Sequence, residues 1–267
     1  MKRTPYTLIT GASAGLGKEF ALQCAKRGMN LILLALPASN VQSLAETLQI
    51  EYPVEAISFE VDLTNVDALK RLVGRIGNLY RINFLINNAG IGGSSAFNDT
   101  APDLIDQIIQ VNVRGTAMLT RFVIPLLISN KKSYILNVAS MAAFTPIAYK
   151  TVYPASKAFI SSFFLGLREE LREQGVSVSV VYPGPVMTNW NTSRRILQQG
   201  LNVKWSLLST SCIVQIALSK TLKGQAVIIP GRMNQLNQYV LALLPREMRL
   251  RIVSRAVKKE LQFSLRA

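Results

Sequence analysis

The sequence predicts an α/β fold with a single doubly wound parallel sheet and helices on both of its faces. Short apolar runs alternate with helical patterns from the N-terminus onward, which is typical of right-handed βαβ units. The first apolar run ends in a glycine-rich turn that leads directly into a helix. The chain has 267 residues and 49% hydrophobic content, the size of one large α/β domain with a full core.

The first elements set the alternation. A strand over Tyr6–Thr10 precedes a helix over Gly15–Arg27, and a strand over Asn30–Ala35 precedes a helix over Val41–Gln49. The same order then continues through further strands at Ala56–Val61, Asn83–Ile86, Ser133–Val138, Val176–Val181 and Ala226–Ile229, and further helices at Val66–Ile76, Pro102–Ser129 and Val152–Gln174. No internal repeat, low-complexity segment or linker interrupts the pattern. We therefore expect one domain over residues 1–267, with residues 232–267 as a basic helical C-terminal extension.

Composition excludes several classes of active site. The chain has no histidine, and Cys24 and Cys212 lie far apart without metal-ligand spacing. A zinc site, a Ser/His/Asp triad and a Cys/His pair are therefore excluded or nearly so, and no metal is expected. Both cysteines lie in apolar stretches, which favours small buried side chains in a reducing compartment.

The N-terminal residues run straight into an apolar strand and leave no room for a signal peptide. No stretch approaches the roughly 18 uncharged apolar residues of a membrane span. A cytoplasmic location is therefore expected.

The net charge of +15 is high for a chain of this size. It is compatible with nucleic acid, an anionic membrane surface, an anionic substrate or simply a basic soluble surface. The sequence offers no recognisable reading helix or aromatic platform, so we expect no nucleic-acid partner.

The turn after the first strand reads Thr10-Gly11-Ala12-Ser13-Ala14-Gly15-Leu16-Gly17. Glycines permit a tight turn and close backbone approach, while the amides at a helix N-terminus attract pyrophosphate. Such a turn can also be merely structural. Its place between a strand and a helix favours the phosphate-binding interpretation.

Tyr153 and Lys157 stand four residues apart, on one face of a predicted helix. A phenol with a pKa of about 10 is a poor general base near neutrality, and a fixed cation nearby lowers that pKa. The pair therefore predicts an acid–base tyrosine. The same spacing arises by chance on many helices, so the interpretation depends on other motifs.

Those motifs occur in order along most of the chain: the glycine turn, Asp62-Leu63-Thr64, Asn87-Asn88-Ala89-Gly90, Asn112, Ser140, the Tyr153/Lys157 pair and Pro183-Gly184. With them the sequence resembles the short-chain dehydrogenase/reductase family, which has a Rossmann fold. The C-terminal part is similar to that of bacterial members resembling ketoacyl and ketosteroid reductases. The resemblance implies an NAD(P)-dependent oxidoreductase that acts on a hydrophobic ketone or alcohol.

The resemblance also implies roles for individual residues. The pyrophosphate would be held by Gly11, Ser13, Gly15, Leu16 and Gly17, and the adenine would border Asp62 and Leu63. The ribose path would be lined by Asn88, Ala89 and Gly90, and the nicotinamide end held by Pro183, Gly184, Val186 and Thr188. Asn87 is expected to tie strands together, and Pro183-Gly184 can also be only a turn.

For the chemistry, the resemblance implies that Tyr153 gives its proton to the carbonyl oxygen and that Ser140 orients that oxygen. Lys157 would lower the Tyr153 pKa and bind the nicotinamide ribose, and Asn112 would hold a water linking Lys157 to solvent. Pro154 departs from the small residue found in many relatives. In the first helical turn its missing donor is unpaired anyway, so we expect a slightly shifted helix start with the chemistry intact.

The choice of nicotinamide cofactor depends on the segment after the second strand, Leu36–Asn40. It lacks the carboxylate with which an NAD enzyme would bind the ribose 2′-hydroxyl. It also lacks the Arg or Lys of many NADP enzymes, although Ser39, Asn40 and the positive field could hold a phosphate. The sequence favours NADP over NAD.

Three further expectations concern the remaining parts of the chain. The polar loop Thr188–Ser206 is either a substrate lid or an ordinary surface excursion. Residues 223–267 hold nine Lys/Arg against Glu247 and Glu260, and the helical stripe Leu250, Val253, Val257, Leu261 suits either a peripheral membrane contact or packing on the protein itself. The helices around Pro102–Ser129 and Val152–Gln174 imply, by the resemblance, a homo-oligomer.

A non-catalytic nucleotide-binding redox sensor on the same fold is the alternative function.

Overall fold

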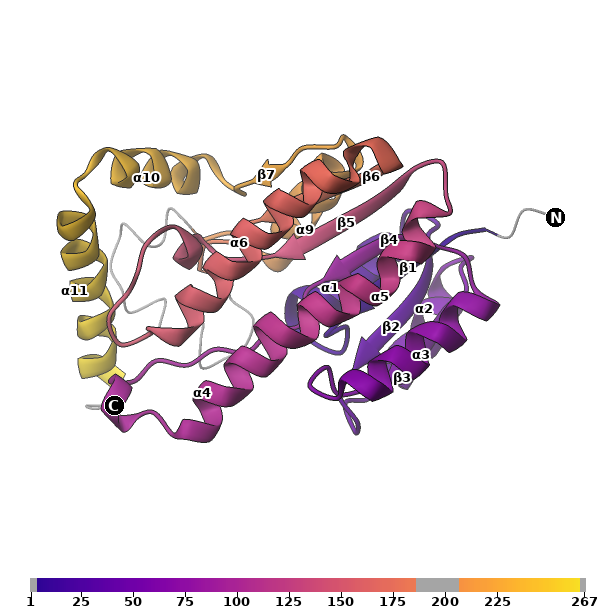
Figure 1. Cartoon of the computed structure of the whole chain (residues 1–267), viewed down its shortest axis with the longest axis horizontal. Coiled ribbons are helices and arrows are strands. Elements are labelled where there is room, and N and C mark those ends of the chain that lie inside the picture. The colour runs from indigo at the N-terminus through magenta and orange to yellow at the C-terminus, as the bar shows by residue number, and fades with distance from the viewer. Residues whose placement is uncertain (1–3, 186–206, 265–267) are drawn as a thin grey trace.

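A computed structural model describes residues 4–185 and 207–264 of the chain. Its centre is one seven-stranded sheet in the order β3-β2-β1-β4-β5-β6-β7, and every neighbouring pair of strands is parallel (Figure 1). The strands are β1 (Tyr6–Thr10), β2 (Asn30–Ala35), β3 (Ala56–Glu60), β4 (Ile82–Asn87), β5 (Ser133–Val138), β6 (Val176–Val181) and β7 (Val227–Ile228). The predicted single parallel sheet is thus confirmed.

Helices cover both faces of this sheet, as predicted. One layer contains α3 (Val66–Leu79), α5 (Thr116–Ile128) and α6 (Val152–Leu171), and the other contains α1 (Gly15–Ala25), α2 (Val41–Glu51) and α9 (Thr210–Leu222). The remaining helices are α4 (Pro102–Ile109), α10 (Arg232–Leu243) and α11 (Arg246–Ser264). The switch in strand order lies between β1 and β4, where an open α/β sheet forms its ligand crevice.

Alternation along the strands explains why both faces need a helical layer. Leu8 packs with the α3/α5/α6 layer and Ile9 with the α1/α2/α9 layer. In β2, Ile32 and Leu33 divide between the two layers in the same way. Because successive side chains point to opposite faces, a strand that is apolar throughout must be buried on both sides.

The helix predicted over Pro102–Ser129 is divided. After α4, residues Gln110–Gly115 form a π-helical segment, and α5 begins at Thr116. The hydroxyl of Thr116, the first residue of α5, donates back to the Val111 carbonyl of this segment over 3.3 Å. Such wide turns are rare and frequently occur at functional sites.

Within the described residues, one helical run, Pro102–Ile128, is long and apolar enough to cross a membrane by length and composition alone. The sequence prediction concerned uncharged runs, and this run includes Arg114 and Arg121. Its apolar content has a structural explanation, because Leu119, Val123 and Leu127 are fully buried against the sheet.

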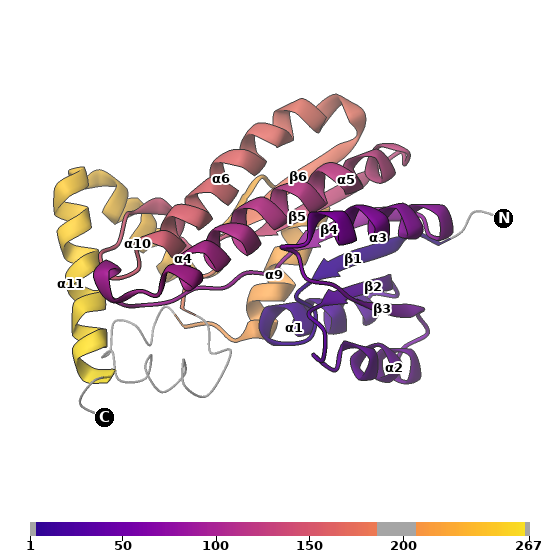
Figure 2. The ribbon, with the colours of Figure 1, turned by 60° about the horizontal axis from the view of Figure 1, so that its bottom comes forward.

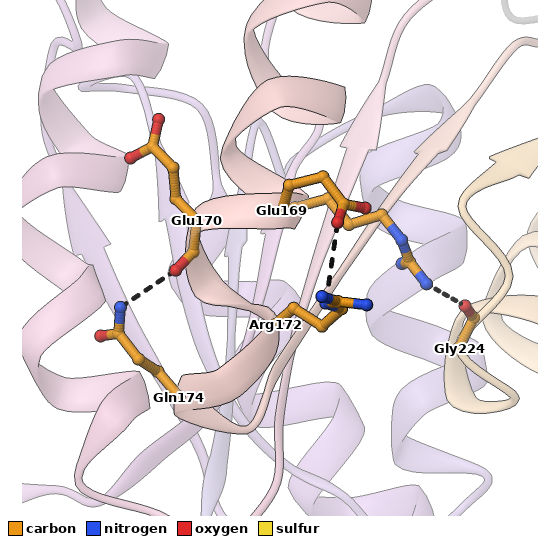
Figure 3. A network of polar contacts seen from close by, with 6 residues as sticks. Glu169, Glu170, Arg172, Gln174 and Gly224 are labelled. Carbon is orange, nitrogen blue, oxygen red and sulfur yellow. Dashed lines mark hydrogen bonds and ion pairs between the residues drawn. The ribbon is translucent and has the colours of Figure 1, made fainter.

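The end of α6 is tied to the sheet by polar contacts (Figure 3). The Arg168 guanidinium donates to the carbonyls of Val178 in β6 and of Gly224, the latter over 2.8 Å. On the solvent side, Arg172 pairs with Glu169 over 3.7 Å, and both side chains are largely exposed. The half-buried Arg168 contacts therefore do more to fix the position of α6 than the exposed pair, since exposed pairs contribute little.

The C-terminal helices α10 and α11 stand at the opposite end of the molecule from the N-terminus, across the carboxyl end of the sheet (Figures 1 and 2). In α11, Val257 is buried and Val253 is half-buried. The sequence left open whether the apolar stripe of this helix contacts a membrane or packs on the protein itself. Val253 and Val257 pack on the protein itself.

Asn87 holds the carboxyl edge of the sheet together. Its side-chain amide donates to Asn137 Oδ1 over 2.8 Å and to Thr120 Oγ1 over 3.0 Å, so it ties β4 to β5 and α5 as the sequence suggested. Asn87→Ala leaves buried acceptors unpaired and should lower the free energy of unfolding by about 2 kcal/mol. Urea denaturation measures the change. Asn78→Ala, at an exposed position of α3, is the control and should change it little; equal effects of both variants would contradict the assignment.

Candidate active site

The predicted site residues come from elements that end or begin at the carboxyl edge of the sheet. The glycine turn follows β1, Asn88 follows β4, and Ser140 follows β5. Tyr153 is the second residue of α6. Because parallel strands share one carboxyl edge, residues about 140 positions apart converge there.

The glycine turn is shaped to admit a ligand rather than side chains. Gly11 and Gly15 have φ values of +63° and +53°, a region that L-residues with side chains rarely adopt. A Cβ atom on Gly17 would lie 1.9 Å from the Gly11 carbonyl oxygen. Helix α1 has no side-chain cap at Ala14, so the amides of its first turn are available to an anion. These features fit the pyrophosphate of a dinucleotide.

Asn88 holds this turn in place. Its side-chain amide donates to the carbonyls of Thr10 and Gly11 over 3.0 and 3.2 Å. In return, Thr10 Oγ1 accepts from the backbone amides of Asn88 and Ala89, both over 3.0 Å. Thr10 therefore connects the ends of β1 and β4, a function that the sequence analysis did not assign to it.

The predicted adenine residues lie beside the end of β3. Asp62 is exposed, and its carboxylate accepts from the Thr64 backbone amide over 2.8 Å. Leu63 is buried, and its carbonyl oxygen lies close to Gly115, where a Cβ atom would be 2.6 Å away. The turn Asp62–Thr64 is therefore held by the Asp62 carboxylate and by the close packing of Leu63 on Gly115.

The structure brings Ser140 and Tyr153 together. The Tyr153 phenol shares a hydrogen bond with the Ser140 side chain, whose oxygen also accepts from the Ala142 amide over 3.1 Å. The serine is thus both the cap of the short 3-10 helix Met141–Phe144 and a partner of the tyrosine.

Lys157 lies one helical turn after Tyr153 and is 5% exposed. Its Nζ donates to the Val138 carbonyl over 2.8 Å and lies 5.9 Å from the centre of the Tyr153 ring. The ammonium is therefore directed at the end of β5, beside the phenol.

Asn112 lies on the π-helical segment and is 1% exposed. Its Oδ1 accepts from the Ile91 amide over 2.9 Å, while its amide donates to the Ile91 carbonyl and to Ser156 Oγ over 2.8 and 2.9 Å. A Cβ atom on Gly90 would lie 3.2 Å from both Asn112 Oδ1 and Lys157 Nζ. Asn112 therefore joins the loop after β4 to α6, next to the lysine.

Burial dominates the electrostatics of the pair. Desolvation raises the pKa of Tyr153 above its ordinary value, and the hydrogen bond from Ser140 opposes this shift. Burial lowers the pKa of Lys157 to about 8. The sequence analysis expected Lys157 to lower the Tyr153 pKa. The net shift of the Tyr153 pKa is upward, because loss of water disfavours the phenolate.

Sequence reasoning missed two residues that contact predicted ones, Gly92 beside Tyr153 and Asn234 beside Gly184. Gly92 borders the tyrosine, since a Cβ atom there would lie 2.8 Å from Tyr153 Cδ2. Gly184 packs against the Asn234 amide of α10, where a Cβ atom would lie 2.9 Å away. The Gly92-Gly93 pair is visible in the sequence, but nothing local in the sequence connects Asn234 to Gly184.

Glu60 is a third group that sequence reasoning missed. The register of β2 and β3 sets it opposite Ala35, and its carboxylate accepts from the Ala38 amide over 3.1 Å. A carboxylate therefore lies beside the Leu36–Asn40 segment, although that segment contains none. Val186, Thr188 and the loop Thr188–Ser206 lie outside the described residues.

Comparison with known proteins agrees with this geometry. Residues 5–198 match the family model described as short chain dehydrogenase. The chain belongs to the short-chain dehydrogenase family. A very-long-chain 3-oxoacyl-CoA reductase of Neurospora crassa is 37% identical over 199 residues, which cover 73% of this chain and 60% of that protein. One from Podospora anserina is 34% identical, covering 73% and 58%. The chain thus spans about three fifths of the length of these curated relatives.

Solved structures of short-chain dehydrogenases show the same architecture. A short-chain dehydrogenase from Sphingobium yanoikuyae in complex with NADPH has a TM-score of 0.75 at 28% identity, covering 91% of this chain and 97% of that one. A bulky-bulky ketone specific alcohol dehydrogenase from Comamonas testosteroni has a TM-score of 0.73 at 28% identity, covering 91% and 95%. Both are oxidoreductases by their names.

Pro154 is the third residue of α6 in this short-chain dehydrogenase, and it is buried. The first four amides of a helix have no partner within it, so the missing N–H of proline loses no helical hydrogen bond. Tyr153 and Lys157 remain one turn apart on this helix.

The lowered pKa of Lys157 makes the stability of this short-chain dehydrogenase depend on pH. The unfolded lysine keeps its proton up to a pH of about 10.5, whereas the folded one releases it near 8. Between these values unfolding takes up a proton, so stability should rise with pH, by about 3 kcal/mol over the window. Urea denaturation from pH 7 to pH 10.5, without added nucleotide, should show this rise in the wild type.

The matched variants are Lys157→Met, which should lack the rise, and Lys70→Met, at an exposed position of α3, which should keep it. An identical pH dependence in wild type and Lys157→Met would contradict the burial argument.

Proposed function

We propose that this chain is a nicotinamide-dependent carbonyl reductase in which Tyr153 is the general acid and base. The observation that carries the proposal is the hydrogen bond between Ser140 and Tyr153, with the buried Lys157 one turn away. Both residues stand at the edge of the sheet that also holds the glycine turn. A proton donor, an orienting hydroxyl and a phosphate-binding turn are the parts that carbonyl reduction requires.

Each residue has a separate task in this proposal. Tyr153 gives its proton to the carbonyl oxygen, and Ser140 orients and polarises that oxygen. Lys157 binds the nicotinamide ribose and stabilises the phenolate that remains, while Asn112 holds the loop after β4 and a water that connects Lys157 to solvent. The nicotinamide supplies the hydride. The raised pKa of Tyr153 keeps the phenol protonated near neutrality, which favours reduction.

The cofactor is held, in the same proposal, by the residues of the glycine turn, by the ends of β3 and β4 and by the segment after β6. These residues are Gly11, Ser13, Gly15, Leu16, Gly17, Asp62, Leu63, Asn88, Ala89, Gly90, Pro183, Gly184, Val186 and Thr188. The shape of the turn and its uncapped helix support the assignment.

The substrate we propose is a hydrophobic ketone, with long-chain 3-oxoacyl thioesters as the first class to test. Two relatives more than 30% identical are named as very-long-chain 3-oxoacyl-CoA reductases, and a structural neighbour is named for bulky ketones. A cytoplasmic, homo-oligomeric enzyme with one catalytic domain and a basic extension over residues 232–267 is part of the same proposal. The groove lined by Ile124, Pro125, Ile128 and Leu167 between α5 and α6 supports self-association.

Tyr153→Phe tests the catalytic assignment directly. The variant lacks the transferable proton, so kcat/KM for ketone reduction should fall by about 10²- to 10⁴-fold. Consumption of reduced nicotinamide over aliphatic, aromatic and acyl-thioester ketones measures it, with thermal melting as the check on folding. Tyr239→Phe changes an exposed tyrosine of α10 and should keep wild-type activity.

Wild-type activity in Tyr153→Phe would contradict the assignment of Tyr153 as the general acid and base. Absence of turnover by the wild type with every ketone, despite nicotinamide binding, would instead favour the redox-sensor function.

We propose NADP as the preferred cofactor, because the segment Leu36–Asn40 has no carboxylate and Ser39 Oγ is buried without a hydrogen-bond partner. Glu60 is the acidic group that opposes a 2′-phosphate there. Glu60→Gln keeps an acceptor for the Ala38 amide but removes the charge. It should lower the KM for NADPH several-fold and leave that for NADH nearly unchanged.

Steady-state kinetics with both cofactors measure the ratio of kcat/KM values. Glu46→Gln, on the far part of α2, is the matched control and should leave the ratio unchanged. A wild-type preference for NADH would overturn the proposal.

A further inference from the structure

Helix α10 has the reverse of the usual polarity of a surface helix. Its inward side is polar: Asn234 is buried and donates to the Pro230 carbonyl over 2.9 Å, and Gln235 donates to the Ile229 carbonyl over 2.8 Å. Its outward side is apolar and consists of Met233, Leu236, Tyr239, Val240 and Leu243, all of them exposed. We call these five residues the α10 stripe.

The spacing of the α10 stripe makes it continuous. At about 100° per residue, its five members fall within an arc of roughly 120° along three turns. The two most exposed members are Tyr239, at 71%, and Leu243, at 86%. Scattered apolar residues on a surface need no explanation, but a stripe of this width on an otherwise polar helix indicates a binding surface.

Helix α11 follows directly and presents positive charge. Its exposed face carries Arg251, Arg255, Lys258 and Lys259 together with Met248 and Ile252. Its apolar stripe is turned inward at Val253 and Val257. Residues 232–259 contain seven Lys/Arg and a single acidic residue, Glu247.

We propose that α10 and α11 form a docking surface for an anionic lipid bilayer. The α10 stripe would enter the boundary between headgroups and acyl chains, and the α11 cations would lie among the lipid phosphates. Tyrosine is favoured at this depth because its ring is apolar and its hydroxyl is polar. The sequence had suggested the α11 stripe for membrane contact. Because that stripe is turned inward at Val253 and Val257, the proposal assigns membrane contact to the exposed α10 stripe instead.

The positive charge of α11 argues against a second copy of this chain as the partner that binds the α10/α11 surface. A two-fold interface brings each surface patch against its own equivalent. Two α11 faces with a strong excess of Lys/Arg would then oppose one another, on a chain whose net charge is +15. An anionic bilayer matches both the apolar stripe and the positive charge.

The docking surface is connected to the active edge of the sheet. The Ala148 amide, in the loop before α6, donates to Ser254 Oγ of α11 over 3.0 Å. At the other end, Asn234 of α10 packs against Gly184. Docking would therefore hold the reacting end of the protein at the bilayer, where a hydrophobic ketone partitions. This last consequence rests on the proposed function, whereas the docking itself does not.

Co-sedimentation of the full chain with phosphatidylcholine vesicles, with and without phosphatidylglycerol, tests the proposal. Binding should require phosphatidylglycerol and weaken at high salt. Leu243→Ser should weaken it by about tenfold, because the leucine loses its burial in the bilayer. Ile50→Ser is the matched control, since Ile50 is 85% exposed on α2, and it should bind as the wild type does.

Charge reversal tests the second half of the surface. Arg255→Glu with Lys259→Glu should weaken binding by at least about tenfold, whereas Lys70→Glu with Arg71→Glu, exposed on α3, should have a clearly smaller effect. Ketone reduction in detergent-free solution, measured in parallel, separates loss of docking from loss of catalysis.

Three results would overturn the proposal. They are absence of binding to anionic vesicles at low salt, equal binding by the α10 and α2 variants, and loss of self-association in Leu243→Ser, by sedimentation velocity, without any vesicle binding.

Discussion

All six strand pairings of the sheet are parallel, so each connection must carry the chain back across a face of the sheet before the next strand begins. The carboxyl ends of the strands consequently share one edge. The glycine turn after β1, Asn88 after β4 and Ser140 after β5 meet there although they are distant in the chain. The central position of β1 and β4 also places the ligand crevice in the middle of this edge.

Side-chain amides stabilise that edge: Asn87 and Asn112 are buried, and Asn88 is half-buried. Asn87 joins β4 to β5, Asn88 joins the glycine turn to β4, and Asn112 joins the loop after β4 to α6. A buried amide that lost its partners would destabilise the fold, so these side chains hold the backbone in one arrangement. Side-chain amides therefore hold the carboxyl edge of the sheet in one arrangement.

The same burial shifts the pKa values of Tyr153 and Lys157. Desolvation disfavours both the phenolate of Tyr153 and the ammonium of Lys157. The protein alone thus favours a protonated tyrosine held by Ser140 and a lysine that titrates near neutrality.

The sequence by itself determined the order of strands and helices, and it predicted most of the residues that the structure gathers at the carboxyl edge of the sheet. Strand alternation, the glycine turn and the Tyr153/Lys157 spacing are local patterns, and local patterns are visible in one dimension. The division of the Pro102–Ser129 helix by a π-helical segment, the charge of Glu60 beside Ala38, and the contact of Asn234 with Gly184 were decided only by the tertiary structure. So were the direction of the Tyr153 pKa and the outward turn of the α10 stripe, because burial depends on which distant segments cover a residue.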